Sequence, residues 1–279
     1  MATIKEQTPK TASTHGNCGP PVKPEWRLLR DGEHSAAWNM AVDEAILDAV
    51  IEGIAPPTLR FYRWNESAIS VGRFQSITRW IDTAACQALG VSIFRRPTGG
   101  RGILHGGDQT VSIVIPKHLL GPFGRSVIES YRYLSGGFVK GLARLNISIS
   151  QGICEKAEGP GGDCFAVRSR ADLLTLEGVK IVGSAQCRRE GVILQQSSLR
   201  HQPPEVDPTQ VFLGTVAADN YPLKDVDEEA LLEALIAGFA EALEVTLRPG
   251  YLTAWEEERA GILIGNSARV SLVDSHSSL

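Results

Sequence analysis

The stretch RRPTGGRGILHGG (residues 95–107) places five glycines, three arginines and one histidine between two apolar runs. Glycines at 99, 100 and 102 allow positive φ angles and remove side chains that would hold a ligand away from the backbone. Backbone N–H groups in such a loop can form an anion-binding concavity, and arginines pair with phosphate or carboxylate. The stretch therefore predicts close approach of the backbone to a polar or anionic group. The alternative is a flexible hairpin with solvated arginines.

The segments around this loop predict an α+β fold with a mixed β-sheet and flanking helices, because strands and helices alternate without strict βαβ winding. Apolar residues at helical spacing predict helices over residues 35–53, 81–90, 126–145 and 225–244. Alternating or apolar runs predict strands over residues 58–64, 68–72, 91–96, 109–116 and 191–198. Residues 171–189 are typical of a hairpin that turns at Glu177 and Gly178.

The 279 residues are enough for one large domain or two modest ones. We expect residues 1–24, which are polar, to be a disordered leader, and residues 25–265 to form the main domain. A small C-terminal segment from about residue 205 could pack beside it, after the linker-like QPPEVDPTQ. Residues 266–279 are expected to be a loose tail.

Composition excludes several classes of protein. A net charge of −4 argues against a nucleic-acid binder, and no apolar run reaches the ~20 residues of a membrane span. The first residues lack the apolar core of a signal peptide. Five cysteines at irregular spacing, with no C-x-x-C pair, indicate neither a disulfide framework nor a structural metal site. We therefore expect a cytoplasmic protein without a metal or other cofactor.

Cys164 follows a glycine-rich loop in GPGGDCF (residues 159–165), where a thiol could be an exposed nucleophile. A nucleophilic thiolate needs a nearby cation or N–H groups. The competing interpretation is a small buried apolar residue, as most cysteines without a disulfide partner are. Cys154 and Cys187 are the realistic competitors for a catalytic role, since Cys18 lies in the leader and Cys86 in a helix.

Lys180 follows the hairpin turn directly and shares a strand face with Val182. A lysine on an apolar face can be desolvated, which would lower its pKa toward that of a useful acid or base. The alternative is a solvent-facing lysine on an edge strand. On the first helix, Asn39 and Asp43 remain candidates for either a pocket or a polar face, and Glu44 fits the polar face.

Five segments in order resemble the superfamily of lipoate–protein ligase A and octanoyltransferases, over roughly residues 26–213. They are WNMAVDEAIL, PPTLRFYRWNESAISVGRFQ, RRPTGGRGILH, CF after a glycine loop, and GVKIVGSAQCRREGVILQQSSL. The resemblance is closest to the cysteine-dependent octanoyltransferases. It implies the α+β fold that this superfamily shares with biotin–protein ligases. It also implies transfer of octanoyl from octanoyl-acyl carrier protein to a lysine of a lipoyl-accepting protein, such as glycine cleavage H protein or a dehydrogenase E2 lipoyl domain.

The resemblance also implies roles for individual residues. Cys164 would take the acyl group as a thioester, and Lys180 would contact the acyl carbonyl and assist proton transfer. The residues expected to line the acyl-donor site are Arg96, Gly99, Gly100 and His105. We further expect AISVG and IVGSA, with Gly72 and Gly183, to line an apolar slot for the octanoyl chain.

The chain departs from the family pattern after His105. The family often has an acidic residue directly after this histidine, whereas this chain reads HGGDQTVSI, with Gly106 in that place and the acid at Asp108. The loop, the cysteine and the lysine are all present, so the expected activity does not change.

Three other functions stay open from the sequence. An octanoyl amidotransferase between lipoyl proteins would use a similar cysteine. An ATP-dependent lipoate–protein ligase works through an acyl adenylate and needs no nucleophilic thiol. A catalytically silent binder of acylated carrier domains would need neither Cys164 nor Lys180.

Overall fold

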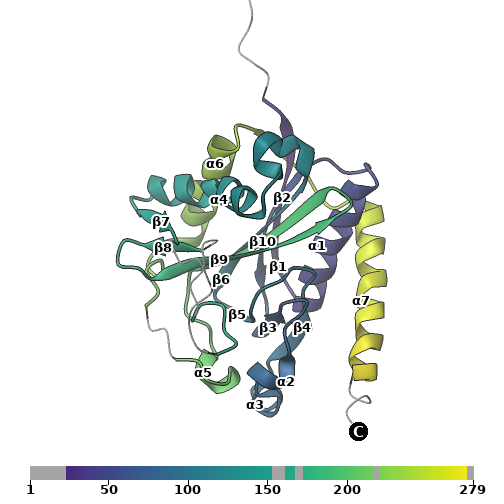
Figure 1. Ribbon diagram of the computed structural model, residues 1–279, viewed down its shortest axis with the longest axis vertical. Helices are drawn as coiled ribbons and strands as arrows, with labels where there is room; N and C mark the ends of the chain where they lie inside the picture. Colours follow the sequence, from purple (N-terminus) through teal and green to yellow (C-terminus); the bar gives the residue numbers. More distant parts are fainter. Residues whose placement is uncertain (1–22, 153–160, 167–171, 217–219, 275–279) are drawn as a thin grey trace, which may run out of the picture.

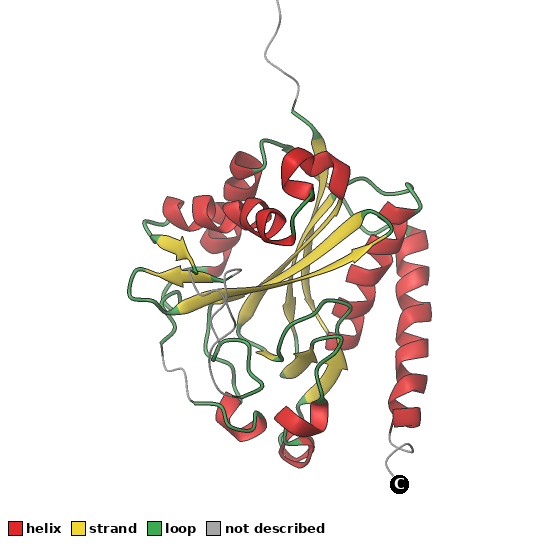
Figure 2. Ribbon diagram, viewed as in Figure 1, coloured by secondary structure: helices red, strands yellow, loops and turns green. Residues whose placement is uncertain are grey.

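An eight-stranded mixed sheet runs through the centre of the computed structural model, which describes residues 23–152, 161–166, 172–216 and 220–274 (Figures 1 and 2). The strands in spatial order are β11 (Thr246–Pro249), β1 (Glu25–His34), β2 (Thr58–Trp64), β6 (Asp108–Pro116), β10 (Val192–Arg200), β9 (Lys180–Arg189), β8 (Leu173–Thr175) and β7 (Ile149–Gln151). Strand β1 pairs in parallel with both β11 and β2, and the other pairs in this sheet are antiparallel.

Helices cover both faces of this sheet (Figure 1). Helices α4 (Val127–Arg144) and α6 (Glu228–Ala242) pack on one face, and α1 (Ala36–Ile51) with α7 (Ala254–Asp274) packs on the other. A short 3-10 helix, η1 (Lys117–Gly124), follows β6. No helix in the described ranges is long and apolar enough to cross a membrane.

The α4–α6 face carries the larger apolar core. Phe239 of α6 packs edge-on against Phe61 of β2 and Phe138 of α4, with ring centroids 5.9 and 5.1 Å apart. Gly137 allows this approach, since a Cβ at that position would overlap the Phe239 ring. Close packing of aromatic rings and helices is therefore what stabilises this side of the sheet.

A second, three-stranded sheet lies at the end of the large sheet where the chain forms the glycine-rich loop (Figure 1). Its strands are β4 (Ser92–Arg95), β3 (Ala68–Val71) and β5 (Ile103–His105). Short helices surround it: α2 (Ile77–Trp80), α3 (Thr83–Ala88) and α5 (Pro208–Val211). The loop over residues 96–102 thus joins two strands of one small sheet, which limits where it can lie.

The predicted α+β class with a mixed sheet is confirmed. Ser35 and Ser126 cap α1 and α4 as their positions suggest, each accepting from a backbone N–H three residues on. The hairpin turns at Gly178, which has a φ of 80°. Several elements carried no pattern that we recognised, among them β1, β5 and β11, and α7 continues to Asp274, through most of the expected tail. Most of the expected leader, residues 1–22, lies outside the described residues.

Candidate active site

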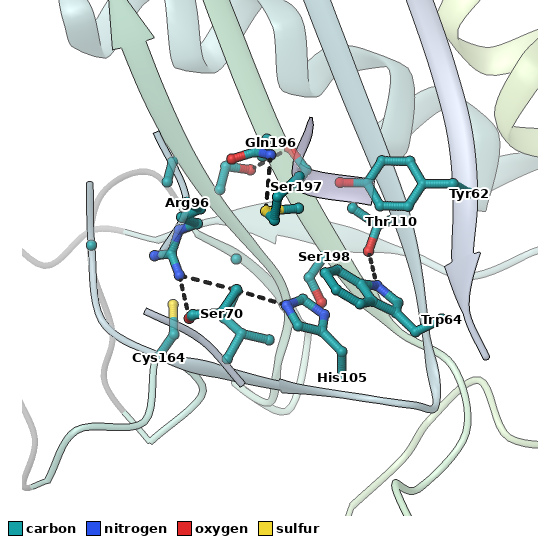
Figure 3. A pocket seen from close by; sticks show the side chains of 16 residues that line it. Tyr62, Trp64, Ser70, Arg96, His105, Thr110, Cys164, Gln196, Ser197 and Ser198 are labelled. Carbon is teal, nitrogen blue, oxygen red and sulfur yellow. Dashed lines mark hydrogen bonds between the residues drawn. The ribbon is translucent and has the colours of Figure 1, made fainter. Parts of the chain in front are cut away.

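A pocket opens between α1, the small sheet and the polar side of β2, β6, β9 and β10 (Figure 3). Its wall combines apolar and polar side chains: Met40, Tyr62, Trp64, Ser70, Arg96, Gly100, Ile103, His105, Thr110, Cys164, Gly183, Ser184, Ala185, Gln196, Ser197 and Ser198. Seven segments of the chain therefore converge here around one cysteine.

Arg96 organises the glycine-rich loop from within. Its guanidinium is 3% exposed and donates hydrogen bonds to Thr98 Oγ1 (3.1 Å), Ser70 O (2.6 Å), Ser70 Oγ (3.2 Å), Gly99 O (2.6 Å) and Arg101 O (2.8 Å). Burial lowers the pKa of Arg96, although an arginine keeps its charge at neutral pH. The N–H donors of Arg96 hold the loop in place, and its charge acts on the pocket that it lines.

The loop is hydrogen-bonded directly to the segment that carries Cys164. The backbone N–H of Cys164 donates to Gly102 O (2.8 Å), and that of Gly102 donates to Gly162 O (3.0 Å). Gly102 is required at this contact because a Cβ there would lie 2.7 Å from the ring of Phe212. Two segments 60 residues apart are thereby fixed against each other, which places the thiol beside the loop.

Cys164 and Lys180 form a contact pair in the pocket. The Nζ of Lys180 lies 3.4 Å from the sulfur of Cys164, 2.7 Å from its carbonyl oxygen and 3.0 Å from Asp172 Oδ1. Lys180 and Asp172 are buried, whereas Cys164 is partly exposed. A cation at this distance can balance the negative charge of a thiolate, which is the form that attacks a carbonyl carbon.

The expected lowering of the Lys180 pKa was wrong. Burial lowers the pKa of this ammonium, but the neighbouring Cys164 and Asp172 together raise it above its ordinary value. Lys180 therefore enters a reaction charged at neutral pH. It can donate a hydrogen bond or a proton, but it does not begin as a base.

The other cysteines have weaker claims. Burial raises the thiol pKa of both Cys86 and Cys187, which disfavours the thiolate. Cys187 lies on β9 next to the apolar α1–α7 cluster, outside the pocket lining. Cys154 and Cys18 lie outside the described residues. Among the thiols that the structure describes, Cys164 is the one with a cation beside it and a pocket in front of it.

His105 lies in the pocket wall and connects two polar groups (Figure 3). Its Nε2 is 2.8 Å from Ser70 Oγ, and its Nδ1 is 2.9 Å from Asp108 Oδ2. The ring stacks on Trp64 at a centroid distance of 3.8 Å. Burial raises the pKa of Asp108, but His105 and the hydrogen bonds from Ser198 and Thr110 lower it by more. The pKa of Asp108 therefore lies below its ordinary value, and this carboxyl is ionised at neutral pH.

A buried polar network lies beneath the pocket. The carboxylate of Asp43 accepts hydrogen bonds from Arg60 Nη1 (2.8 Å), Tyr62 OH (2.8 Å), Ser112 Oγ (2.7 Å) and Gln196 Nε2 (2.7 Å). The amide of Asn39 joins it through Arg60 Nη2 (2.9 Å). Both candidates on α1 are thus fully buried, and they anchor the pocket floor without lining it. Glu44 is partly exposed and pairs with Arg189 at 3.4 Å.

Five of the eight predicted site residues line the pocket: Arg96, Gly100, His105, Cys164 and Gly183. Lys180 is not part of the lining but contacts the Cys164 sulfur. Gly99 and Gly72 are not part of the lining. Gly99 turns its carbonyl to Arg96, and Gly72 packs against the loop, where a Cβ would overlap the Gly100 carbonyl oxygen. Gly72 therefore shapes the loop.

Sequence reasoning missed four residues near the thiol. Asp172 and Ser70 gain their partners only through strand pairing, and Trp64 meets His105 of the other sheet, so no local pattern could have indicated them. Tyr131 of α4 interacts electrostatically with Arg96 and Cys164, and burial raises its pKa to about 12. It therefore stays protonated at neutral pH. The acid at position 108 carried a visible signal, because it stands three residues after His105.

Comparison with known proteins agrees with this geometry. The family described as the lipoyl protein ligase A/B catalytic domain matches residues 35–209. An octanoyltransferase LipM from Kyrpidia tusciae is 40% identical over 260 residues, which cover 84% of this chain and 93% of that protein. An octanoyltransferase LipM from Symbiobacterium thermophilum is 40% identical over 265 residues, covering 87% and 95%. The chain belongs to the lipoyl protein ligase A/B catalytic domain family and is an acyltransferase.

Solved structures agree on the fold. A protein from T. acidophilum, assigned as a lipoate protein ligase and solved with bound lipoic acid, superposes with a TM-score of 0.71 at 25% identity. That match covers 88% of this chain and 96% of the other. A lipoate-protein ligase A bound with ATP also superposes at 0.71 and 25% identity, covering 86% and 94%. The expected lipoate–protein ligase-like fold is confirmed.

Proposed function

We propose that this protein transfers an octanoyl group from octanoyl-acyl carrier protein to a lysine of a lipoyl-accepting protein, through a thioester on Cys164. The observation that carries the proposal is the ammonium of Lys180, 3.4 Å from the Cys164 sulfur in a pocket with an apolar wall. The names of the relatives that cover most of the chain support octanoyl as the acyl group. The acceptor would be a lipoyl domain such as that of glycine cleavage H protein or a dehydrogenase E2.

The first half-reaction begins with attack of the Cys164 thiolate on the carbonyl carbon of the donor thioester. The oxygen of the tetrahedral intermediate becomes negative, and a preorganised donor near it lowers the barrier. Lys180 is such a donor, because its Nζ lies within hydrogen-bond reach of the thiol and Asp172 keeps it charged. Collapse of the intermediate breaks the donor C–S bond, and the carrier thiolate leaves and takes a proton from solvent, so Lys180 stays an ammonium.

The second half-reaction transfers the acyl group to nitrogen. The acceptor amine attacks the carbonyl carbon of the acyl-enzyme, a second oxyanion forms, and the C–S bond to Cys164 breaks. The departing thiolate returns to the same ammonium partner. One cation therefore serves both steps, which fits a lysine that is held by Asp172 rather than by the substrate.

The pocket offers apolar surface for the octanoyl chain. Met40, Trp64, Ile103 and Ala185 line it, and Gly183 faces Cys164 with no side chain between. A Cβ at position 183 would lie 3.2 Å from the sulfur. The glycine thus keeps the path between thiol and pocket open.

An assay without ATP tests this function. Purified protein, octanoyl-acyl carrier protein and an apo lipoyl domain should give an acceptor that is heavier by one octanoyl group. The Cys164→Ala variant should give none. If the acceptor is modified only with ATP and free octanoate, and Cys164→Ala retains that activity, the protein is a ligase and the proposal is wrong. If only an octanoylated lipoyl protein serves as donor, the protein is an amidotransferase.

A further inference from the structure

Acyl transfer to an amine produces a proton that the pair of Cys164 and Lys180 does not accept. A lysine side chain is an ammonium at neutral pH and must lose a proton to become a nucleophile. Its nitrogen must lose another as the amide forms. The raised pKa of Lys180 makes this residue a donor at the start of the step. The pocket therefore needs a second group that accepts a proton.

Ser70, His105 and Asp108 form a continuous chain of hydrogen bonds in the pocket wall. Ser70 Oγ is 2.8 Å from His105 Nε2, and His105 Nδ1 is 2.9 Å from Asp108 Oδ2. These side chains come from β3, β5 and β6, and all three residues are less than 10% exposed. Trp64 stacks on the imidazole, which restrains the ring plane. Their arrangement matches the serine, histidine and carboxylate order of known proton-transfer triads.

The neighbours of the chain determine where its hydrogens lie. Asp108 is ionised at neutral pH, so the imidazole Nδ1 carries the hydrogen and donates it to that carboxylate. Nε2 of a neutral imidazole is then an acceptor. Arg96 Nη1 donates to Ser70 Oγ at 3.2 Å, so the serine hydroxyl directs its own hydrogen to Nε2. These hydrogen bonds therefore allow a proton to pass from Ser70 to His105.

These hydrogen-bonded residues share the pocket with the thiol. Ser70, His105 and Cys164 line the same pocket, and Arg96 donates a hydrogen bond to Ser70 Oγ and interacts electrostatically with Cys164. The charged groups facing His105 are Asp108 on β6 and, beyond Ser70, Arg96. The carboxylate of Asp43 lies behind Tyr62 and is satisfied by the polar network beneath the pocket.

We propose that Ser70 accepts the proton of the attacking amine and that His105 and Asp108 are the positioning residues that draw it away. This inference rests on the proposed function. The amine nitrogen bonds to the acyl carbon while its proton passes to Ser70 Oγ, and the serine hydrogen moves to His105 Nε2. The imidazolium is stabilised by Asp108, and the electron pair of the broken C–S bond remains on Cys164 beside Lys180. The imidazolium then returns its proton to solvent.

The test separates the two half-reactions and changes the nucleophile. Variants His105→Gln and Ser70→Ala are mixed with octanoyl-acyl carrier protein, and the mass of the protein is followed to measure acyl-enzyme formation. The isolated acyl-enzyme is then given either an apo lipoyl domain or hydroxylamine. Hydroxylamine is weakly basic, so it enters as a neutral amine and loses its proton readily to water. Ser135→Ala is the matched control, since Ser135 is buried in α4 and its hydroxyl has no partner in the described part of the chain.

For both His105→Gln and Ser70→Ala we expect transfer to the lipoyl domain to fall by about 10²–10⁴-fold. Acyl-enzyme formation and release by hydroxylamine should both stay within about threefold of the wild type, and added imidazole should restore part of the transfer. If the variants lose the same fraction of the rate with both nucleophiles, or lose as much in acyl-enzyme formation, then Ser70, His105 and Asp108 only shape the pocket. If the wild-type protein forms no acyl-enzyme, the proposed function fails and the relay fails with it.

Discussion

The two faces of the central strands of one sheet differ sharply. On β2, Leu59 and Phe61 point into the apolar core under α4 and α6. On the same strand, Arg60 and Tyr62 point to the opposite side, where both bond to Asp43 of α1. All of these side chains are almost completely buried. The comparison teaches that burial has two uses here: one face stabilises the fold, and the other holds polar groups in fixed positions around the thiol.

Burying the side chains of the polar face costs more free energy than burying those of the apolar face. Removing a charged pair from water is opposed by desolvation, and only complete hydrogen bonding makes the burial tolerable. The Asp43 carboxylate meets this requirement with four donors. Gln196 continues the network to Thr98 in the glycine-rich loop, so the position of that loop depends on the polar face. The predictions below ask whether activity and stability really divide between the two faces.

The largest expected effect is on catalysis at the polar face. Replacing Lys180 with methionine should slow acyl transfer by about 10²–10⁴-fold, because the oxyanion and the departing thiolate lose their cation. It should also reduce stability, since the buried Asp172 carboxylate would lose its ion pair with Lys180. The double variant Lys180→Met with Asp172→Asn should recover stability without activity. Single-turnover rates and urea unfolding of both variants check this, and recovery of activity in the double variant would contradict it.

The apolar face should show the reverse behaviour. Phe239→Ala removes a ring packed against Phe61 and Phe138, and should lower the free energy of unfolding by about 3–5 kcal/mol. The transfer rate per folded molecule should stay within about twofold of the wild type. Urea unfolding and an active-site titration measure the two quantities. A tenfold loss of rate in folded protein would mean that the faces are coupled.

A buried charge distant from the thiol sharpens the comparison. Glu256 of α7 binds Arg27 through two hydrogen bonds, of 2.5 and 2.8 Å. Burial raises the pKa of Glu256, but Arg27 and Thr253 lower it more. Glu256→Gln should cost about 2 kcal/mol of stability at pH 7 and leave the transfer rate unchanged.

The pH dependence of this pair has a defined sign. A carboxyl whose folded pKa is lowered stabilises the protein above its unfolded pKa, about 4.3 for glutamate, and loses that contribution as the pH falls through the folded value. The difference in stability between wild type and Glu256→Gln should therefore be constant near neutral pH and shrink below about pH 4. A difference that grows on acidification would contradict the assignment.

The smallest expected effect distinguishes two glycines. Gly183→Ala places a Cβ 3.2 Å from the Cys164 sulfur, and a larger side chain there would fill the pocket. Gly183→Val should raise the KM for an octanoyl donor about tenfold more than for a butanoyl donor. Gly72→Val should instead displace the loop at Gly100 and slow transfer from both donors by the same factor. Equal effects on both donors from Gly183→Val would show that position 183 does not face the acyl chain.

Local patterns predicted a large part of the fold. Helix periodicity predicted α1 and α4, and a glycine at the turn predicted the β8–β9 hairpin. Strand alternation predicted β2 but could not say that both faces of that strand are buried, because Arg60 becomes interior only when Asp43 lies opposite. Strand β1 pairs in parallel with strands on either side, through contacts that no short segment encodes.

The candidate site divided in the same way. The glycine-rich loop, Cys164 and Lys180 carried local signals or a resemblance, and the structure brings them together. The residues that determine the chemistry of this loop and this pair carried no such signal. Asp172 reaches Lys180 because β8 pairs with β9, and Ser70 reaches His105 because β3 pairs with β5. The charge state of Lys180 depends on Asp172, which is why its pKa direction was predicted wrongly.

The most direct test of the account is the mass of the protein itself after mixing with octanoyl-acyl carrier protein in the absence of ATP. We expect the wild-type protein to gain one octanoyl group, Cys164→Ala to gain none, and Cys187→Ala to behave as the wild type. No gain in the wild-type protein, or the same gain in Cys164→Ala, would contradict a thioester on Cys164 and reduce the pair with Lys180 to a structural contact.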